Sequence, residues 1–459
     1  MRVLHTSDWH LGTTLGRVRR EADHDVVLDE IAAIAAQGEL DLVVHTGDVF
    51  DHARPGVEEL HRAFEALARL AALAPVVVIA GNHDSSDLFE VLDRVVGMTA
   101  RLAGDASAHR IRFVGHARPA GRGGVLTFPG GAGSEGQEAR LAVLPFVHPN
   151  ALVRSFDLPA ERWNGSYTDG VGLVEANLAD GLTTGFDPTR HVALFAAHLH
   201  VGGAVWSGSE RKVHVADDYA TKVDHLPTAS YAAFGHIHRP QELPGAVGRY
   251  AGSPIPIDFG ELGEAKSVVV LDAPPGRRAR PEVVPLSGGR PLVRLAGTLE
   301  EVAAKADPAS TGIHQVIVDV EAPVPDLAEQ IARLLPKATL HSVVERVAGA
   351  APPVAEEVDP GAEPPVADQF REFLAAKGTS GPRVDRAMKV FEAFLGAGLD
   401  GDDPAFPDED DFELPTELAE RLSTEPASGD GGDGGDGRGR APAEAAAGAP
   451  PSGAGGGQG

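Results

Sequence analysis

The sequence predicts a layered α/β fold with a metal site at one edge of a sheet. Two observations predict it: apolar strands alternate with helical patterns from the N-terminus onward, and each strand ends in a cluster of polar residues. Because the carboxyl ends of parallel strands meet at one edge of a sheet, these clusters are expected to converge there. The length of 459 residues leaves room for two or three domains at about 150 residues each.

Three β-then-α units begin the chain. Apolar strands are expected at residues 3–6, 42–46 and 76–80, and helical patterns with apolar spacings near three and four follow at 23–36, 56–72 and 85–96. Further strands are expected at 111–114, 125–128, 141–146, 191–197, 231–234 and 267–272. In the third helix, Leu88, Val91, Leu92 and Val95 either belong to the core or pair two subunits.

Composition changes divide the remainder of the chain. A first domain is expected over residues 1–285, and a smaller unit over 286–348 has the order strand, helix, strand, helix, strand. Residues 349–365 form a Pro/Glu-rich linker, 366–398 contain two short amphipathic helical patterns, and 399–459 form an acidic, Gly/Ala/Pro-rich tail that is expected to be disordered. The small unit is short for an independent domain, so we expect it to pack on the first.

Composition also excludes several classes of function. The absence of cysteine excludes disulfides, thiolate catalysis, zinc ribbons and iron–sulfur clusters. The net charge is −27, of which residues 351–459 contribute −15 with 23 acidic and 8 basic side chains. An acidic chain is poorly suited to bind nucleic acid strongly by itself, because that binding is driven by basic side chains that release counterions. The N-terminus has no signal-peptide pattern and no apolar run has membrane length, so a cytoplasmic protein is expected.

The polar clusters at the strand ends contain residue types that bind divalent metals. Mixtures of Asp, Asn and His favour Mn²⁺, with Zn²⁺ or Fe²⁺ as alternatives. An Asp that bridges two ions would give a site able to position hydroxide for attack on phosphorus. A turn or helix cap at residues 81–85 is the structural alternative for one cluster, but it does not explain all five. The residues are Asp8, His10, Asp48, Asn82, His83, Asp84, His198, His236 and His238.

These motifs resemble those of a known superfamily, the calcineurin-like metallophosphoesterases, whose fold is a layered α/β sandwich. The forms SDWHLG, HTGDVFD, VIAGNHDS, FGHIHRPQ and RYAGSPIPIDFGE are similar to those of the SbcD family, the Mre-type nuclease subunits of SbcCD complexes. The resemblance is close over residues 1 to about 260, and the unit at 290–347 matches that family's capping domain in order and size.

The resemblance implies a role for each candidate residue. One ion would be held by Asp8, His10, Asp48 and His238, and the other by Asp48, Asn82, His198 and His236. His83 would contact the scissile phosphate and protonate the leaving 3′ oxygen, and Asp84 would orient His83. His200 is the alternative to His198, and both His5 and His45 are expected to be packed or supporting groups. Where some relatives have a histidine after the Phe of the GDxF motif, this chain has Asp51 followed by His52.

The resemblance also implies substrates, cofactors and partners. It implies a 3′–5′ exonuclease on double-stranded DNA and an endonuclease on single strands, cleaving ends and hairpins in repair, recombination and replication. Two Mn²⁺ ions per subunit are expected, with Mg²⁺, Zn²⁺ or Fe²⁺ possible. The chain would form a homodimer within a heterotetramer with an SbcC-type SMC ATPase. Its amphipathic helices would dock on that partner's coiled coil or pack on the chain itself, through Phe370, Phe373, Leu374, Met388, Phe391 and Leu395.

Two other functions are compatible with parts of the sequence. A small-molecule phosphodiesterase or nucleotidase would use the same dinuclear site, although such enzymes rarely need a capping unit and partner-binding helices. A catalytically silent scaffold for an ATPase would have no need of Asn82, His83 and Asp84.

Overall fold

The computed structural model describes residues 1–104, 110–147, 167–207, 209–210 and 220–347, together with the helical positions Arg371, Leu374, Val384 and Met388. The chain divides into two compact units, Met1–Ala350 and Ala351–Gly459. All strands described below belong to the first unit, and none of the helices that the structure describes is long and apolar enough to span a bilayer.

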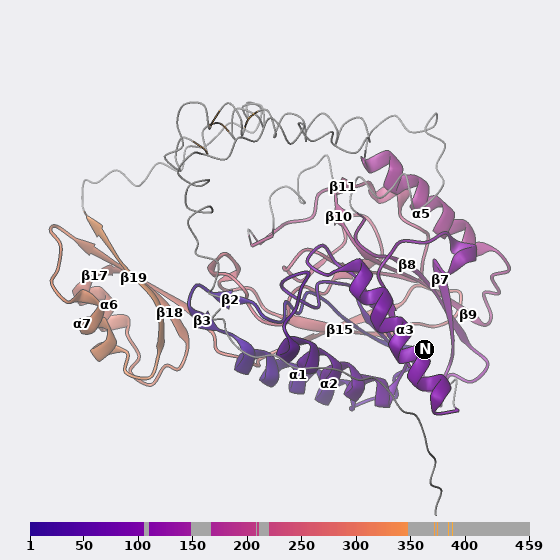
Figure 1. The fold of residues 1–459 in the computed structure, drawn as a ribbon, viewed down its shortest axis with the longest axis horizontal. Coiled ribbons are helices and arrows are strands. Elements are labelled where there is room, and N and C mark those ends of the chain that lie inside the picture. Colours follow the sequence, from indigo (N-terminus) through magenta and orange to yellow (C-terminus); the bar gives the residue numbers. More distant parts are fainter. Residues whose placement is uncertain are drawn as a thin grey trace, which may run out of the picture. The chain divides into compact units, whose positions relative to one another are not determined.

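Two six-stranded sheets form the body of the first unit (Figure 1). In the first sheet, four parallel strands are extended by two antiparallel ones, in the order β16 (Arg280–Pro285), β15 (Ser267–Asp272), β1 (Arg2–Thr6), β4 (Leu42–His45), β5 (Val76–Ile79) and β6 (Ile111–Val114). The second sheet has the order β13 (Gln241–Glu242), β14 (Gly248–Tyr250), β12 (Tyr231–Gly235), β9 (His191–His198), β8 (Glu138–Leu144) and β7 (Val125–Pro129). Its inner four strands are parallel, with β7 and β13 antiparallel at the edges.

The apolar residues of each strand alternate between two cores, as the period of a strand requires. Val77 and Ile79 of β5 pack between the two sheets with Leu194 of β9, whereas Val76 and Val78 face the opposite way. That outer face is covered by α1 (Glu21–Ala35), α2 (Val57–Leu73) and α3 (Ser86–Leu102), with α1 and α2 side by side (Figure 1). Helix α5 (Tyr167–Thr183) covers the outer face of the second sheet. The predicted layered α/β fold is therefore confirmed as helix, sheet, sheet, helix.

Short elements connect these layers. They comprise the hairpin β2 (Thr14–Leu15) and β3 (Val18–Arg19), the pair β10 (His200–Val201) and β11 (Ala220–Thr221), and the 3-10 turns η2 (Ala120–Arg122), η6 (Val223–His225) and η7 (Phe259–Glu261).

A smaller three-stranded unit follows β16 in the chain. Its parallel strands are β17 (Leu292–Thr298), β18 (Ile313–Val320) and β19 (Thr339–Val347), with α6 (Leu299–Lys305) and α7 (Leu327–Leu334) between them. This is the predicted element order. The unit has its own core, and it also contacts the first domain, since Leu292 and Ile313 share a buried cluster with Leu15 and Phe259.

The structure differs from the sequence-based expectation in two helices. Helix α3 continues to Leu102, six residues beyond the expected end. Helix α5 was not predicted, because three glycines, Gly170, Gly172 and Gly181, interrupt its apolar pattern and lower its helix propensity.

Most residues of the amphipathic patterns at 366–398 lie outside the described residues. They include Phe370, Phe373, Phe391 and Leu395. Leu374, Val384 and Met388 have helical backbone, and the side chain of Met388 is buried. The linker at 349–365 and the tail at 399–459 also lie outside the described residues.

Candidate metal centre

The candidate site residues come from loops at the carboxyl ends of five parallel strands. Asp8 and His10 follow β1, Asp48 follows β4, and residues 82–84 follow β5 in the first sheet. His198 is the last residue of β9, and His236 and His238 follow β12, in the second sheet. The two sheets stack so that these ends meet, and the structure therefore brings together residues far apart in the sequence, such as His10 and His238, which are separated by 228 positions.

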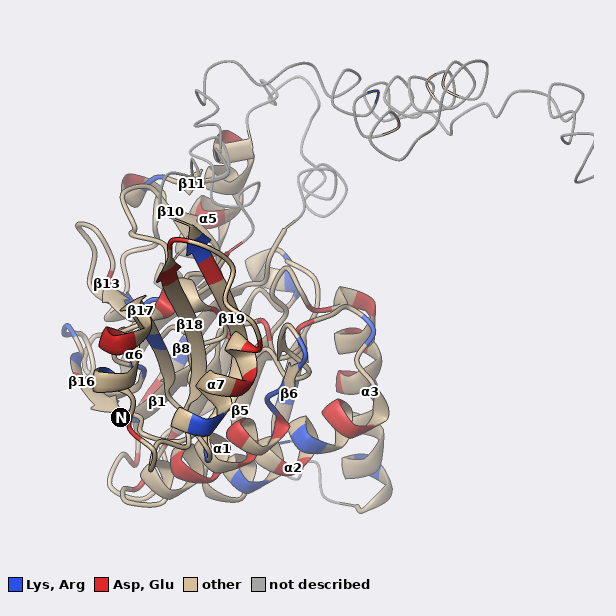
Figure 2. Ribbon diagram, turned by 90° about the vertical axis from the view of Figure 1, so that its left-hand side faces the viewer, with Lys and Arg blue, Asp and Glu red and all other residues tan. Residues whose placement is uncertain are grey.

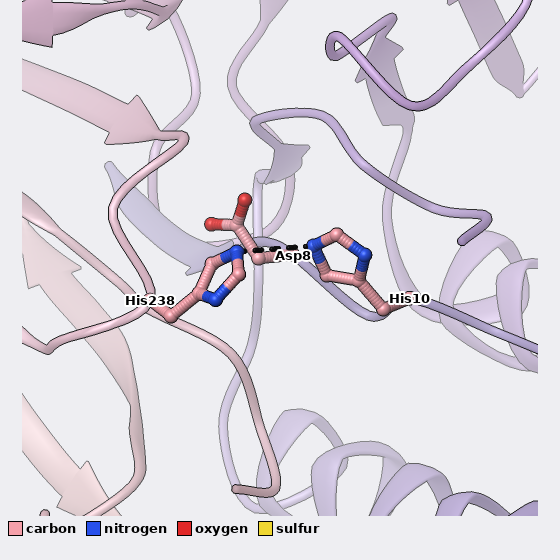
Figure 3. A group of neighbouring side chains, drawn as sticks. All are labelled: Asp8, His10 and His238. Atoms are coloured by element: carbon pink, nitrogen blue, oxygen red, sulfur yellow. Dashed lines mark hydrogen bonds between the residues drawn. The ribbon is translucent and has the colours of Figure 1, made fainter. Parts of the chain in front are cut away.

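One group of possible ligands is formed by Asp8, His10 and His238, whose donor atoms lie within 4.8 Å of one another (Figure 3). The Nε2 atoms of His10 and His238 face each other at 3.1 Å. All three side chains are buried. Two imidazole nitrogens that converge in this way share either a proton or a cation, so their arrangement fits a metal ion.

A second group is formed by Asp48, His198 and His236, again within 4.8 Å. The side-chain oxygen of Asn82 lies 2.9 Å from Nε2 of His198 and 2.7 Å from Nδ1 of His236. Oδ2 of Asp48 lies 3.3 Å from Nε2 of His198 and 3.6 Å from Nε2 of His10. Asp48 thus stands between the two groups, in the position that a bridging carboxylate needs.

Backbone conformation sets these side chains apart from their neighbours. Among the described residues, five other than glycine have a positive φ, and four of them are candidate ligands: Asp8 (51°), His10 (46°), Asp48 (52°) and His236 (96°). Such conformations cost free energy and cluster at functional sites. The tight turns at these residues direct their side chains into the site at the ends of the strands.

Two glycines of the motifs are required by close packing. A Cβ at Gly47 would collide with the imidazole of His198, and one at Gly81 would collide with the carboxylate and main chain of Asp48. The glycines that precede Asp48 and Asn82 therefore let the loops after β4 and β5 approach each other closely.

A family model and several curated relatives match the chain. Residues 1–240 match the family model "Calcineurin-like phosphoesterase". The SbcD chain of the SbcCD nuclease from Bacillus subtilis (strain 168) is 32% identical over 421 residues, covering 88% of this chain and 100% of the relative. Its counterparts from Rhodobacter capsulatus and Escherichia coli K12 are each 30% identical, covering 80% and 67% of this chain and 90% and 74% of the relatives.

The chain belongs to the SbcD family of calcineurin-like phosphoesterases. The resemblance that the motifs indicate is therefore confirmed over most of the chain, well beyond the five clusters. Membership makes the chain a metal-dependent phosphodiester hydrolase.

His83 lies beside both groups in this SbcD-family chain. Its ring is 4.7 Å from that of His10 in an edge-to-face arrangement, and its donor atoms lie within 4.8 Å of those of His10 and Asp48. It is half-buried, like its neighbour Asn82, whereas the other candidate ligands are buried. Its Nδ1 donates to the main-chain carbonyl of Asp51 at 2.8 Å.

Asp84, which the resemblance expects to orient His83, binds main-chain amides of two loops. The carboxylate of Asp84 accepts hydrogen bonds from the main-chain N–H groups of Val49, Phe50 and Gly81, at 2.9 to 3.2 Å. It ties the loop after β4 to the loop after β5, which carries His83. Asp side chains in tight turns commonly accept hydrogen bonds from nearby main-chain amides.

The structure also separates the candidate histidines that the sequence left open. His198 belongs to the second group, whereas His200 lies on β10 opposite Ala220 and is in none of the groups found among the described residues. His5 contacts the hydroxyls of Tyr231 and Thr46, and its burial lowers its pKa to about 3. His45 accepts a hydrogen bond from Gly47 N–H, and burial likewise lowers its pKa to about 3. Both are packed groups, as expected.

The electrostatics of the site favour a cation. Burial lowers the pKa of His198, but the adjacent carboxylate of Asp48 outweighs it and raises the pKa to about 9. Burial also lowers the pKa of His10, but the hydrogen bond to Asp51 and the charge of Asp48 raise it to about 9. Burial raises the pKa of Asp48, yet His198 and His10 hold it well below its usual value. The buried carboxylates thus favour the protonated, positively charged imidazoles. Divalent ions bound at this site would supply that positive charge instead.

Sequence reasoning missed the groups that stand behind the candidate ligands. Asp51 contacts Nδ1 of His10 at 3.1 Å, and Glu261 contacts Nδ1 of His238 at 3.2 Å. Phe146 stacks on His236, with ring centroids 6.1 Å apart. Asp51 and Glu261 both lie inside the quoted motifs HTGDVFD and IDFGE, so a signal was present, but a carboxylate in a motif does not reveal which histidine it supports.

Proposed function

We propose that this chain is the nuclease subunit of an SbcCD-type complex and hydrolyses phosphodiester bonds of DNA at a dinuclear metal site. The single observation that carries the proposal is the position of Asp48 between two groups of buried ligands, with His83 beside both. Asp8, His10, Asp48 and His238 would hold one ion, and Asp48, Asn82, His198 and His236 the other. Their oxygen and imidazole donors suit Mn²⁺. Mg²⁺, Zn²⁺ and Fe²⁺ are alternative ions for the same ligands.

Divalent ions at these positions would polarise the scissile phosphate and lower the pKa of the attacking water. The chain's own residues supply orientation and the proton for the leaving group. Because Nδ1 of His83 donates to the carbonyl of Asp51, the proton that His83 transfers is the one on Nε2. His83 would protonate the leaving 3′ oxygen. We expect 3′–5′ exonuclease action on double strands and endonuclease action on single strands, as the family resemblance implies.

An exposed aromatic side chain near the site supports the use of single strands. Trp206 is 45% exposed, and the next residue, Ser207, donates its N–H to Glu210, which in turn accepts from the N–H of His238. The loop that carries Trp206 is therefore tied to a candidate ligand. Unpaired bases stack well on such exposed rings.

The charge of the chain supports a requirement for a partner. Figure 2 shows Asp and Glu interspersed with Lys and Arg over α1, α2 and α3, and the first 350 residues carry a net charge of −12. Sustained DNA binding would then depend on an SbcC-type SMC ATPase, on whose coiled coil the helices within 366–398 would dock. The complex would work in the cytoplasm, in DNA repair, recombination and replication.

An apolar stripe on α3 supports a homodimer within that heterotetramer. Val91, Val95, Met98 and Leu102 recur at intervals of three and four residues and are between 46% and 80% exposed, whereas Leu92 and Val96 pack on the core. The stripe therefore lies on the outer face of the helix, and a second copy of the chain would bury it.

The test is cleavage of an end-labelled DNA hairpin with Mn²⁺, with and without the ATPase partner and ATP. We expect His83→Ala to lower the rate at least 100-fold, and the matched surface variant His61→Ala on α2 to retain it. Hydrolysis of cyclic nucleotides that needs His83, without cleavage of any DNA, would instead favour a small-molecule phosphodiesterase. Wild-type cleavage by His83→Ala would contradict the role of His83.

A further inference from the structure

The two histidines of the first group are each supported from behind by a carboxylate. Nδ1 of His10 lies 3.1 Å from Asp51, and Nδ1 of His238 lies 3.2 Å from Glu261. In both rings, Nε2 is then the nitrogen that faces the site, as the 3.1 Å approach of the two Nε2 atoms shows (Figure 3). Neither carboxylate belongs to the groups of candidate ligands found among the described residues.

Glu261 is itself held rigidly. It is fully buried, and its oxygens accept hydrogen bonds from the hydroxyls of Ser209 and Ser253 and from the main-chain N–H of Ile257. The ammonium group of Lys266, also buried, lies 2.6 Å from Glu261.

Lys266 extends this support to the main chain of His238. Its ammonium group donates to the carbonyl of His238 and to Ser253, each at 3.0 Å. Ser209 completes the arrangement, since its hydroxyl donates to Glu261 at 2.6 Å and lies 2.8 Å from Nδ1 of His238. The ring and the backbone of His238 are thus both fixed by one buried ion pair.

His198 of the second group is supported differently. Nδ1 of His198 donates to the neutral main-chain carbonyl of Thr46 at 2.7 Å. His236 turns Nδ1, not Nε2, toward Asn82. A carboxylate behind an imidazole makes its metal-facing nitrogen a stronger donor than a carbonyl does, and it fixes the ring more firmly.

We propose that the two metal positions are unequal, and that Asp51 and Glu261 are positioning residues that make the first position, at Asp8, His10, Asp48 and His238, the tighter one. This inference rests on the proposed dinuclear site and deepens it. The first ion binds to a rigid, carboxylate-supported pair of histidines and stays bound, while the ion beside Asn82, His198 and His236 exchanges more readily.

The experiment is Mn²⁺ titration of the full chain, with free Mn²⁺ measured by electron paramagnetic resonance and the heat of binding by calorimetry. Wild type should bind two equivalents in a tighter and a weaker class. Asp51→Asn and Glu261→Gln should each weaken the tighter class about 10- to 100-fold and leave the weaker class unchanged. His198→Ala should remove the weaker class only.

Glu264→Gln is the matched control, because Glu264 contacts Lys266 and Ser207 in the same region. It should retain both classes. Thermal melting in EDTA checks that each variant is folded. If Glu261→Gln is not folded, Ser209→Ala takes its place and should weaken the tighter class alone.

Three results would overturn the inference: equal affinities in wild type, equal weakening of both classes by Asp51→Asn, or loss of the tighter class in His198→Ala. A wild-type chain that binds fewer than two equivalents would instead contradict the dinuclear site of the proposed function. The two failures are therefore distinguishable without any measurement of nuclease activity.

Discussion

The main-chain carbonyl oxygen of Asp51 accepts a hydrogen bond from Nδ1 of His83 at 2.8 Å. The side chain of the same residue contacts His10 at 3.1 Å. One residue therefore supports a candidate ligand through its carboxylate and the candidate proton donor through its backbone. A side-chain substitution at this position removes only the first of these contacts.

Asp51→Asn should therefore lose activity through weaker metal binding, whereas His83→Ala should lose it through the missing proton donor. Raising the Mn²⁺ concentration should restore much of the rate of Asp51→Asn and none of the rate of His83→Ala. The measurement is the initial rate of hairpin cleavage over a Mn²⁺ series. Equal rescue of both variants would show that His83 acts mainly in metal binding.

Asp84→Ala should destabilise the chain strongly, because it leaves three main-chain N–H groups without their acceptor. The loss in the free energy of unfolding should be on the order of 3 kcal/mol or more. Urea unfolding in EDTA measures it without a contribution from metal. Asp29→Ala, which removes only an exposed ion pair with Arg69, should cost less than about 1 kcal/mol. If Asp84→Ala lowers the free energy of unfolding no more than Asp29→Ala does, Asp84 does not hold the two loops together.

Glu175→Gln should stabilise the chain at alkaline pH. Burial raises the pKa of Glu175 to about 8, above its usual value of 4.5, although Thr221 donates a hydrogen bond that opposes the shift. Between these two pH values the folded chain retains a proton that the unfolded chain has lost, so the stability contributed by this group falls as the pH rises from 4.5 to 8.

Glutamine does not titrate, so the advantage of Glu175→Gln in the free energy of unfolding should grow over the same pH range. At about pH 8.5 it should reach a few kcal/mol as an order of magnitude, and near pH 4.5 it should vanish. Urea unfolding at both pH values gives the result, with the exposed Glu65→Gln as control. An advantage independent of pH would show that Glu175 is charged in the folded chain.

Val95→Glu should convert a dimer into monomers, because it places a charge in the middle of the exposed stripe on α3. The mass from light scattering after gel filtration measures this directly. Val26→Glu changes a comparably exposed valine of α1, 54% exposed, and should leave the mass unchanged. If both variants remain dimers, the subunit interface does not include the stripe on α3.

Trp206→Ala should weaken binding of single-stranded DNA about 10-fold, whereas Trp206→Phe should retain most of it, because a ring can still stack on a base. Fluorescence anisotropy of a labelled oligonucleotide, with Ca²⁺ in place of Mn²⁺ to prevent cleavage, measures the affinity. If Trp206→Ala binds single strands as wild type does, the exposed ring has another role.

The sequence predicts the layers of the fold and the clustering of the ligands because both depend on local patterns. Val76 to Ile79 alternate between two cores, and Asn82 follows shortly after the end of that strand. Helix α5 is missed because glycines interrupt its apolar pattern. Two other features depend on tertiary contacts: Asp84 binds main-chain amides of two loops, and Glu261 reaches His238 from a turn 23 residues away. Which carboxylate supports which imidazole is decided by packing.

The left-handed backbone at Asp8, His10, Asp48 and His236 has a consequence for how the chain can vary. Asp, Asn and His are the residues other than glycine that adopt this conformation most readily, and they are also good metal donors. At these four positions the backbone conformation thus disfavours a glutamate or a β-branched residue, whether or not its side chain could bind a metal ion. Each left-handed residue costs about 1 to 3 kcal/mol, which the surrounding sheets must supply whether or not an ion is present. Backbone conformation and metal-binding chemistry therefore both restrict which residues can occupy these positions.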